Sequence, residues 1–256
     1  MEPPPAAEGI SPEPPPLPGP AVVAQRWVDL VFLHWPYRPA DVQALLPSGV
    51  SVDTHDGMAW IALVPFEMHG LRPVGAPPVP GLRRFVEINV RTYAVDSEGR
   101  RAVWFFSLDV PNPLMPALAR ASFGAPYCLA RAIHATEEID GHERHGYAMT
   151  RRWPSPAGAS AVVDIEVGAP MSPAEIDPLA HFLTARWAAL TSWAGRILRS
   201  PVVHEAWPLH RATCLRVEQD IIQAVGLPPP AGEPLTHFSP GVAARFSRPR
   251  RVAGGR

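Results

Sequence analysis

The sequence contains no lysine, so all 23 of its basic side chains are arginines. A buried lysine amine can lose its proton and attack a carbonyl carbon to form a Schiff base, whereas a guanidinium stays protonated and only binds or stabilises negative charge. Only the α-amino group of Met1 could form an imine. A GC-rich genome, which replaces lysine codons by arginine codons, is sufficient to explain the composition. The chemical exclusion holds whatever its cause.

Cysteines and long apolar runs are also scarce. The two cysteines, Cys128 and Cys214, lie far apart in the sequence and form no disulfide framework, which indicates reduced thiols in a cytoplasmic protein. No apolar run approaches the roughly 20 residues of a membrane span. The formal net charge of −1 gives no long-range field that would attract a polyanion. We therefore expect neither a nucleic-acid partner nor a membrane partner.

The common motifs of nucleotide and acyl chemistry are missing as well. The sequence has no GxGxxG and no GxSxG, and a Walker-type loop is excluded because it needs a lysine. We therefore predict no cofactor.

Composition divides the chain into a domain with two unstructured ends. Nine prolines and no basic residue in the first twenty positions predict a disordered leader over residues 1–24. Residues 25–246, in a chain that is 46% hydrophobic, can bury one substantial core. The arginine-rich residues 247–256 predict a frayed basic tail. The oligomeric state stays open.

Strand patterns dominate the predicted domain. Residues 26–33 predict a first strand that ends at Pro36, and the Asp56-Gly57 step predicts a hairpin that pairs residues 50–53 with residues 58–65. A proline-rich loop is expected between Met68 and Arg84. The next two strands, residues 85–95 and 102–108, form the clearest predicted hairpin.

Helical signals interrupt the strands at a few places. Short helices are predicted at residues 38–46 and 113–121, and Ser172-Pro173-Ala174-Glu175 predicts a capped helix whose apolar stripe includes Trp187 and Leu190. Further strands are predicted from Tyr127, at residues 147–153, at residues 161–167 and at residues 202–211. The segment that follows, Cys214 to Val225, fits either a helix or a strand. Strands at hairpin spacing with three helices predict an α+β fold built on an antiparallel sheet or barrel, which could hold one small ligand.

One face of the strand over residues 85–95 carries the most promising site. Glu87, Asn89 and Arg91 alternate with apolar residues and share that face. If the face points into a barrel, Arg91 could bind a carboxylate and Glu87 could move a proton. If it points to water, the row is an ordinary solvated surface.

Ten histidines raise the question of a metal site. His142 and His145 could share an ion, and His204 with His210 offers another pair. Neither pair has the spacing of a known ligand set, and Pro208 prevents a regular helix between the second pair. We therefore predict no metal site.

Several long strings resemble a bacterial family of uncharacterised proteins, DUF2071 or YqjF-like. They are LLPSGVSVDTHDGMAWIALVPFEM, FVEINVRTY, VWFFSLD, HEAWPL and HFSPGV. The resemblance covers about residues 25–246. It implies no established reaction.

The family is more distantly similar to the acetoacetate decarboxylase fold, a β-barrel-like cone with a few flanking helices and an interior active site. In those decarboxylases a strand opens with a site glutamate, and FVEINV, which contains Glu87, resembles that string. A second string, which supplies the Schiff-base lysine and its neighbour, is similar to residues 124–129, where Tyr127 and Cys128 stand in place of the two lysines. Imine-based decarboxylation is therefore not expected with the fold.

The resemblance and the strand pattern together predict a barrel that binds a small molecule, for which an organic anion is one candidate. If it is an enzyme, Glu87 would be the base and Tyr127 the acid or orienting group of a lysine-independent proton transfer on an oxo or carboxylic acid. Arg91, Asn89, Cys128 and Trp104 would line the binding site, although Cys128 also fits a buried structural thiol. The alternatives are a non-catalytic carrier and a protein whose interior is filled by Trp60, Trp104, Phe106 and Tyr127.

Overall fold

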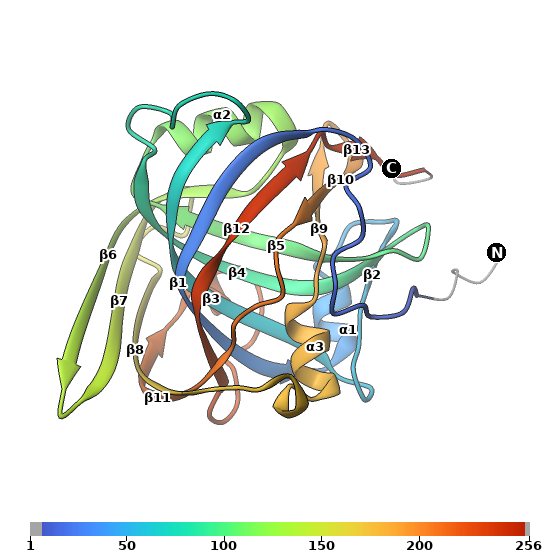
Figure 1. Cartoon of the computed structure of the whole chain (residues 1–256). Helices are drawn as coiled ribbons and strands as arrows, with labels where there is room; N and C mark the ends of the chain where they lie inside the picture. Colours follow the sequence, from blue (N-terminus) through green and yellow to red (C-terminus); the bar gives the residue numbers. More distant parts are fainter. Residues whose placement is uncertain (1–6, 254–256) are drawn as a thin grey trace.

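The computed structural model of the chain describes residues 7–253, and these form a barrel-like sheet with short helices at its edges (Figure 1). The strands are β1 Ala21–Tyr37, β2 Val50–Val52, β3 Ala59–Pro73, β4 Arg84–Asp96, β5 Arg101–Val110, β6 Tyr127–Ile139, β7 His142–Trp153, β8 Ser160–Pro170, β9 Ala188–Trp193, β10 Arg196–Val203, β11 His210–Gln219, β12 Leu235–Ser247 and β13 Arg250–Arg251. The helices are α1 Pro39–Gln43, α2 Leu114–Phe123, α3 Pro178–Thr184 and α4 Ile221–Ala224, with a 3-10 turn at Pro173–Glu175. No helix within the described residues is long and apolar enough to cross a membrane.

The strands close into two rings that share one wall, formed by β12, β1, β3, β4 and β5. The order β5-β6-β7-β8-β11-β12-β1-β3-β4 closes because β4 also pairs with β5, and a second path, β5-β9-β10-β12, joins the same wall through the pairing of β10 with β12. Most pairings are antiparallel, but β5 runs parallel to both β6 and β9. The predicted barrel with a few flanking helices is therefore confirmed. The fold is mostly β and its sheet is mixed, which corrects the prediction of an antiparallel barrel of α+β type.

The shared wall has two different faces because side chains alternate along each strand. On β4, Val86, Ile88 and Val90 belong to a large apolar core inside the first ring. The polar residues between them, Glu87, Asn89 and Arg91, point to the opposite face. That face meets β9, β10 and α2 rather than water, so the solvated interpretation of this row is wrong.

The hairpin predicted at Asp56-Gly57 does not form. The turn is present as a single bridge between His55 and Met58, but β2 pairs with β4 and not with β3. The predicted hairpin of residues 85–95 and 102–108 is confirmed as β4 and β5. Although the Asp56-Gly57 turn forms, β2 pairs with a strand segment that lies over forty residues away in the sequence.

Two strands are longer than their sequence signals. β1 contains 17 residues and includes Pro36, the expected stop. β3 continues to Pro73, so strand replaces the first part of the loop expected from Met68. Both strands are extended because they pair with each other over most of their length.

The C-terminal half departs most from prediction. The capping box at Ser172 is present, but it caps only a 3-10 turn, and α3 ends at Thr184. Leu190 lies on β9 and Trp187 just before it, so neither belongs to a helical stripe. β9, β12 and the N-terminal part of β10 were not predicted.

Both expected tails contact the barrel. The Glu8 backbone amide donates to the Gly99 carbonyl, and the Trp187 indole donates to the Ser11 carbonyl. At the other end β13 pairs with β10, and Val252 is fully buried. The prediction of a frayed tail is therefore wrong for residues 250–252, whereas residues 1–6 and 254–256 lie outside the described part of the chain.

Candidate active site

A cavity of about 440 Å³ lies on the second face of the shared wall. Its wall is mainly apolar, with Trp27, Phe66, Phe105, Leu108 and Trp207 among the lining residues. A small number of polar side chains interrupt this surface, an arrangement that suits a small ligand with one or two polar groups.

Glu87 is the most strongly perturbed acid in the cavity. Its side chain comes from β4, the residue is 2% exposed, and the Tyr127 hydroxyl donates a hydrogen bond of 3.2 Å to its Oε2. Burial raises the pKa of Glu87 to about 7, against the opposing effect of the hydrogen bonds from Tyr127 and Asn89. Burial and the neighbouring Glu87 raise the pKa of Tyr127 well above its usual value, so the phenol stays protonated. A carboxyl group near neutrality beside a neutral phenol can exchange protons with a bound molecule.

Asn89 and Arg91 lie further along the same face of β4. The Asn89 Oδ1 atom and the Arg91 Nε atom are buried without a hydrogen-bond partner among the residues that the structure describes. The Arg91 guanidinium lies 5.5 Å from the centre of the Phe32 ring and 5.9 Å from that of Tyr93. Buried polar atoms without partners cost free energy, and a polar ligand in the cavity would supply the missing partners.

A second guanidinium reaches the cavity from an unexpected segment. Arg186 follows α3, is 5% exposed, and donates to Asp53 Oδ2 at 2.6 Å. Its Nη2 atom has no partner within residues 7–253. Burial lowers the pKa of Arg186, and Asp53 opposes that shift. No sequence motif indicated this residue, which lies between a helix and a strand.

A buried histidine, His204, also lines the cavity. Its Nδ1 lies 2.6 Å from the Glu205 carbonyl oxygen, which only accepts, so Nδ1 carries the proton and Nε2 is an acceptor. Burial lowers the pKa of His204 to about 4, so the ring is neutral. Trp27, Trp187 and Trp207 surround it at centroid distances of 4.7 to 5.4 Å. The string HEAWPL contains both His204 and Trp207 and was the available sequence signal.

Two predicted binding residues lie outside the cavity. Trp104 packs against a separate core formed by residues such as Ala188 and Ile197, because its neighbours on β5, Val103 and Phe105, occupy the cavity face. Cys128 follows Tyr127 on β6 and alternates to the other face, where its thiol lies 3.4 Å from the Pro126 carbonyl oxygen. The placement of both residues as ligand contacts is therefore corrected.

The structure does not support the alternative of an interior filled by four aromatic side chains. Trp60 and Phe106 pack against other cores, like Trp104, and only Tyr127 of the four candidate filling residues lines the cavity.

In each of the two histidine pairs considered for metal binding, the two histidines have different surroundings in the structure. His142 faces Glu166 at 3.8 Å, whereas His145 contacts His134. His210 lies 3.1 Å from the Gly168 carbonyl oxygen, away from the cavity that holds His204.

The sequence model of one protein family, DUF2071, matches residues 24–243 of the chain. This family is described as an uncharacterized conserved protein. The chain belongs to the DUF2071 family. This DUF2071 chain is also 33% identical over 220 residues to the uncharacterized protein YqjF of Bacillus subtilis (strain 168), covering 85% of the chain and 87% of that protein. The resemblance seen in the sequence strings is thereby confirmed.

Solved structures show the same fold at low sequence identity. An acetoacetate decarboxylase-like enzyme from Sphingomonas wittichii RW1 is 12% identical with a TM-score of 0.61, over 91% of this chain and 94% of that chain. The enduracididine biosynthesis enzyme MppR complexed with pyruvate is 14% identical with a TM-score of 0.56, over 91% of each chain. Acetoacetate decarboxylase from Legionella pneumophila is 13% identical with a TM-score of 0.58, over 91% of this chain and 88% of that chain. The DUF2071 chain therefore has an acetoacetate decarboxylase-like fold.

Proposed function

We propose that the cavity binds a small oxo or carboxylic acid and transfers a proton without an imine intermediate. The observation that carries the proposal is the juxtaposition of Glu87, Tyr127 and Arg91 on one cavity wall, with a carboxyl pKa near 7. The absence of lysine removes the imine route that a Schiff-base decarboxylase needs.

The anion would be held by the guanidinium groups. Arg91 forms no ion pair with any carboxylate of residues 7–253, and Arg186 keeps one nitrogen unpartnered beyond its contact with Asp53. A ligand carboxylate that accepts from these donors would be bound by charge-assisted hydrogen bonds. The structural neighbour MppR is complexed with pyruvate, a small oxo acid, which supports this ligand class.

The proton step follows from the protonation states. Glu87 in its ionised form removes a proton from the carbon next to the substrate carbonyl, and the electron pair of that C–H bond moves toward the carbonyl oxygen. Once Glu87 is protonated, the Tyr127 hydroxyl can release it and donate its single hydrogen to the enolate oxygen. The protonated Glu87 then returns the proton to carbon. The cycle is a reversible enolisation whose net result is hydrogen exchange at that carbon, and no oxidant or reductant is needed.

Isotope exchange tests the proposal directly. We expect the protein to accelerate exchange of the pyruvate methyl hydrogens in D₂O, followed by ¹H NMR, and Glu87→Gln to reduce the protein-dependent rate by 100-fold or more, within the range of about 10²–10⁴ for general base catalysis. Arg91→Gln should raise the pyruvate concentration needed for half-maximal exchange. The matched control is Glu138→Gln, which removes an exposed carboxylate outside the cavity. Equal exchange by wild type and Glu87→Gln would contradict the proposal.

A non-catalytic carrier is the second candidate, and the mainly apolar wall of the cavity favours it. Calorimetric titration with pyruvate and with longer-chain 2-oxo acids distinguishes the two. Saturable binding by wild type and by Glu87→Gln, without hydrogen exchange in either, would identify a carrier.

A further inference from the structure

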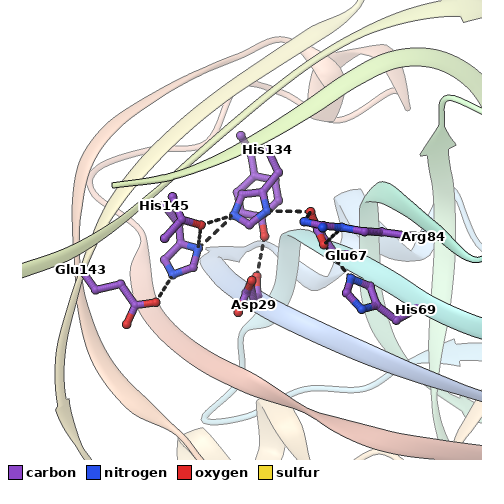
Figure 2. Close-up of polar contacts among 9 residues, drawn as sticks. Asp29, Glu67, His69, Arg84, His134, Glu143 and His145 are labelled. Atoms are coloured by element: carbon purple, nitrogen blue, oxygen red, sulfur yellow. Dashed lines mark hydrogen bonds and ion pairs between the residues drawn. The ribbon is translucent and has the colours of Figure 1, made fainter. Parts of the chain in front are cut away.

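A second group of titratable side chains lies between β1 of the shared wall and the strands β6 and β7 (Figure 2). Asp29 on β1, His134 on β6 and His145 on β7 each place one ligand-type atom within 4.8 Å of the other two. None of the three lines the cavity that contains Glu87. The side chains of His134 and His145 are 3% and 1% exposed, and Asp29 is partly exposed.

The outer nitrogen of each histidine faces a carboxylate. His134 Nδ1 lies 3.0 Å from Glu67 Oε1, and His145 Nε2 lies 2.9 Å from Glu143 Oε1. Glu67 also accepts two hydrogen bonds from Arg84, at 2.6 and 2.8 Å, so it is held as a carboxylate. A carboxylate only accepts, and both outer nitrogens therefore carry the ring proton.

The inner nitrogens then meet as two acceptors. His134 Nε2 and His145 Nδ1 are 3.0 Å apart, and in neutral rings with the outer nitrogens protonated each presents a lone pair to the other. Thr136 Oγ1 lies 3.4 Å from both nitrogens, but its single hydrogen can be donated to only one of them. The gap between the rings needs a positive charge, either a proton or a metal ion.

The backbone of β1 directs a third ligand toward this gap. Trp27 and Leu30 both line the cavity although they are three residues apart, because the pairing of β1 with β3 shifts by one residue after Val28. Asp29 therefore lies on the opposite face, in a left-handed conformation with φ of 54°, and its carbonyl oxygen accepts a 2.6 Å hydrogen bond from Tyr147. Such a conformation costs a non-glycine residue free energy. A shared proton needs only the two nitrogens, whereas a metal ion also uses the anionic oxygen that this bulge supplies.

We propose that Asp29, His134 and His145 bind a divalent transition metal, with Zn²⁺ the best match. Two imidazole nitrogens and one carboxylate form a three-ligand zinc set that leaves a coordination position for water. Tetrahedral ligation at about 2.0–2.1 Å separates two nitrogens by about 3.3 Å, so the nitrogens need to part by a few tenths of an ångström and the rings to turn until both lone pairs point to the ion. Glu67 and Glu143 hold the ligand rings from outside, as carboxylates commonly do around zinc.

Metal titration of the full-length, untagged protein tests the site. After dialysis against a chelator, we expect calorimetric titration with ZnCl₂ to show one equivalent bound, and Co²⁺ to give the visible absorption of a four-coordinate complex. His134→Gln and Asp29→Asn should each weaken Zn²⁺ binding by 100-fold or more. Glu143→Gln, which removes only an outer partner, should weaken it by about 10–100-fold.

The controls remove histidines outside the site. His142→Gln and His210→Gln should bind one equivalent with unchanged affinity, and circular dichroism of every variant confirms that it is folded. Asp29→Asn keeps the shape of the side chain, so it remains informative if His134→Gln does not fold. Absence of stoichiometric binding by wild type, or binding that Asp29→Asn and His134→Gln leave unchanged, would overturn the proposal and leave a shared proton between the rings.

Discussion

The hydroxyl of Tyr127 and the carboxyl group of Glu87 lie 40 residues apart in sequence and 3.2 Å apart in the cavity. The contact exists because β6 lies parallel to the end of β5, which in turn pairs with β4. It joins the two residues to which the proposed proton transfer is assigned, and it makes their ionisation interdependent.

The buried carboxyl group should make the stability of the fold depend on pH. Glu87 keeps its proton in the folded state up to about pH 7, whereas in the unfolded chain it loses it near pH 4.5, so the folded state binds more protons between these values. The free energy of unfolding should therefore fall as the pH rises through this window, by up to roughly 3 kcal/mol from this group. Urea unfolding of wild type and Glu87→Gln from pH 4.5 to 8 measures the effect. A difference between the two proteins that stays constant across the window would contradict it.

The hydrogen bond from Tyr127 favours the ionised form of Glu87. Tyr127→Phe should therefore raise the pKa of Glu87 further, because burial then acts with one fewer opposing hydrogen bond. Titration of ¹³C-labelled glutamate carboxyl groups by NMR measures this pKa, with Glu87→Gln to assign the signal. Tyr37→Phe is the matched control, since the Tyr37 hydroxyl donates to the Pro228 carbonyl and not to the cavity. A downward shift in Tyr127→Phe would be inconsistent with the geometry.

Asp53 is the carboxylate shared by two arginines, Arg101 and Arg186. Asp53→Asn should destabilise the fold by about 3–5 kcal/mol, because it leaves the buried Arg186 without its ionic partner. The control is Asp41→Asn, which removes the partner of Arg38, a side chain that is 80% exposed, and should cost less than about 1 kcal/mol. Urea unfolding at pH 7 compares the two variants. Equal decreases in the free energy of unfolding would show that the buried ion pair stabilises the fold no more than the exposed one.

Two glycines with similar backbone angles separate conformational strain from close packing. Gly124 ends α2 with φ of 71°, and a Cβ there would lie 2.2 Å from the Ser192 carbonyl oxygen. Gly141 has φ of 77° but nothing within 4 Å of its Cβ position. Gly141→Ala should cost about 1 kcal/mol from the left-handed backbone alone, and Gly124→Ala at least about 2 kcal/mol more. Thermal unfolding tests this, and similar midpoints for the two variants would rule out the close contact.

Local patterns anticipated individual strands better than their partners. The β4 and β5 hairpin and the polar row on β4 follow from alternation and a short turn, which are properties of neighbouring residues. The Asp56-Gly57 turn also forms, yet β2 pairs elsewhere. Trp104 was misplaced because β5 is apolar on both faces, so its composition did not indicate which face would meet the cavity.

The sequence by itself determined that the chain has no lysine amine for imine chemistry, and that Glu87, Asn89 and Arg91 share one face of a strand. Only the tertiary structure decided that this face encloses a cavity, that Arg186 joins it, and that a bulge in β1 brings Asp29 to His134 and His145. The difference has a physical cause. Side-chain alternation repeats every two residues and is visible locally, whereas ring closure depends on the summed pairing of strands that are far apart in the chain.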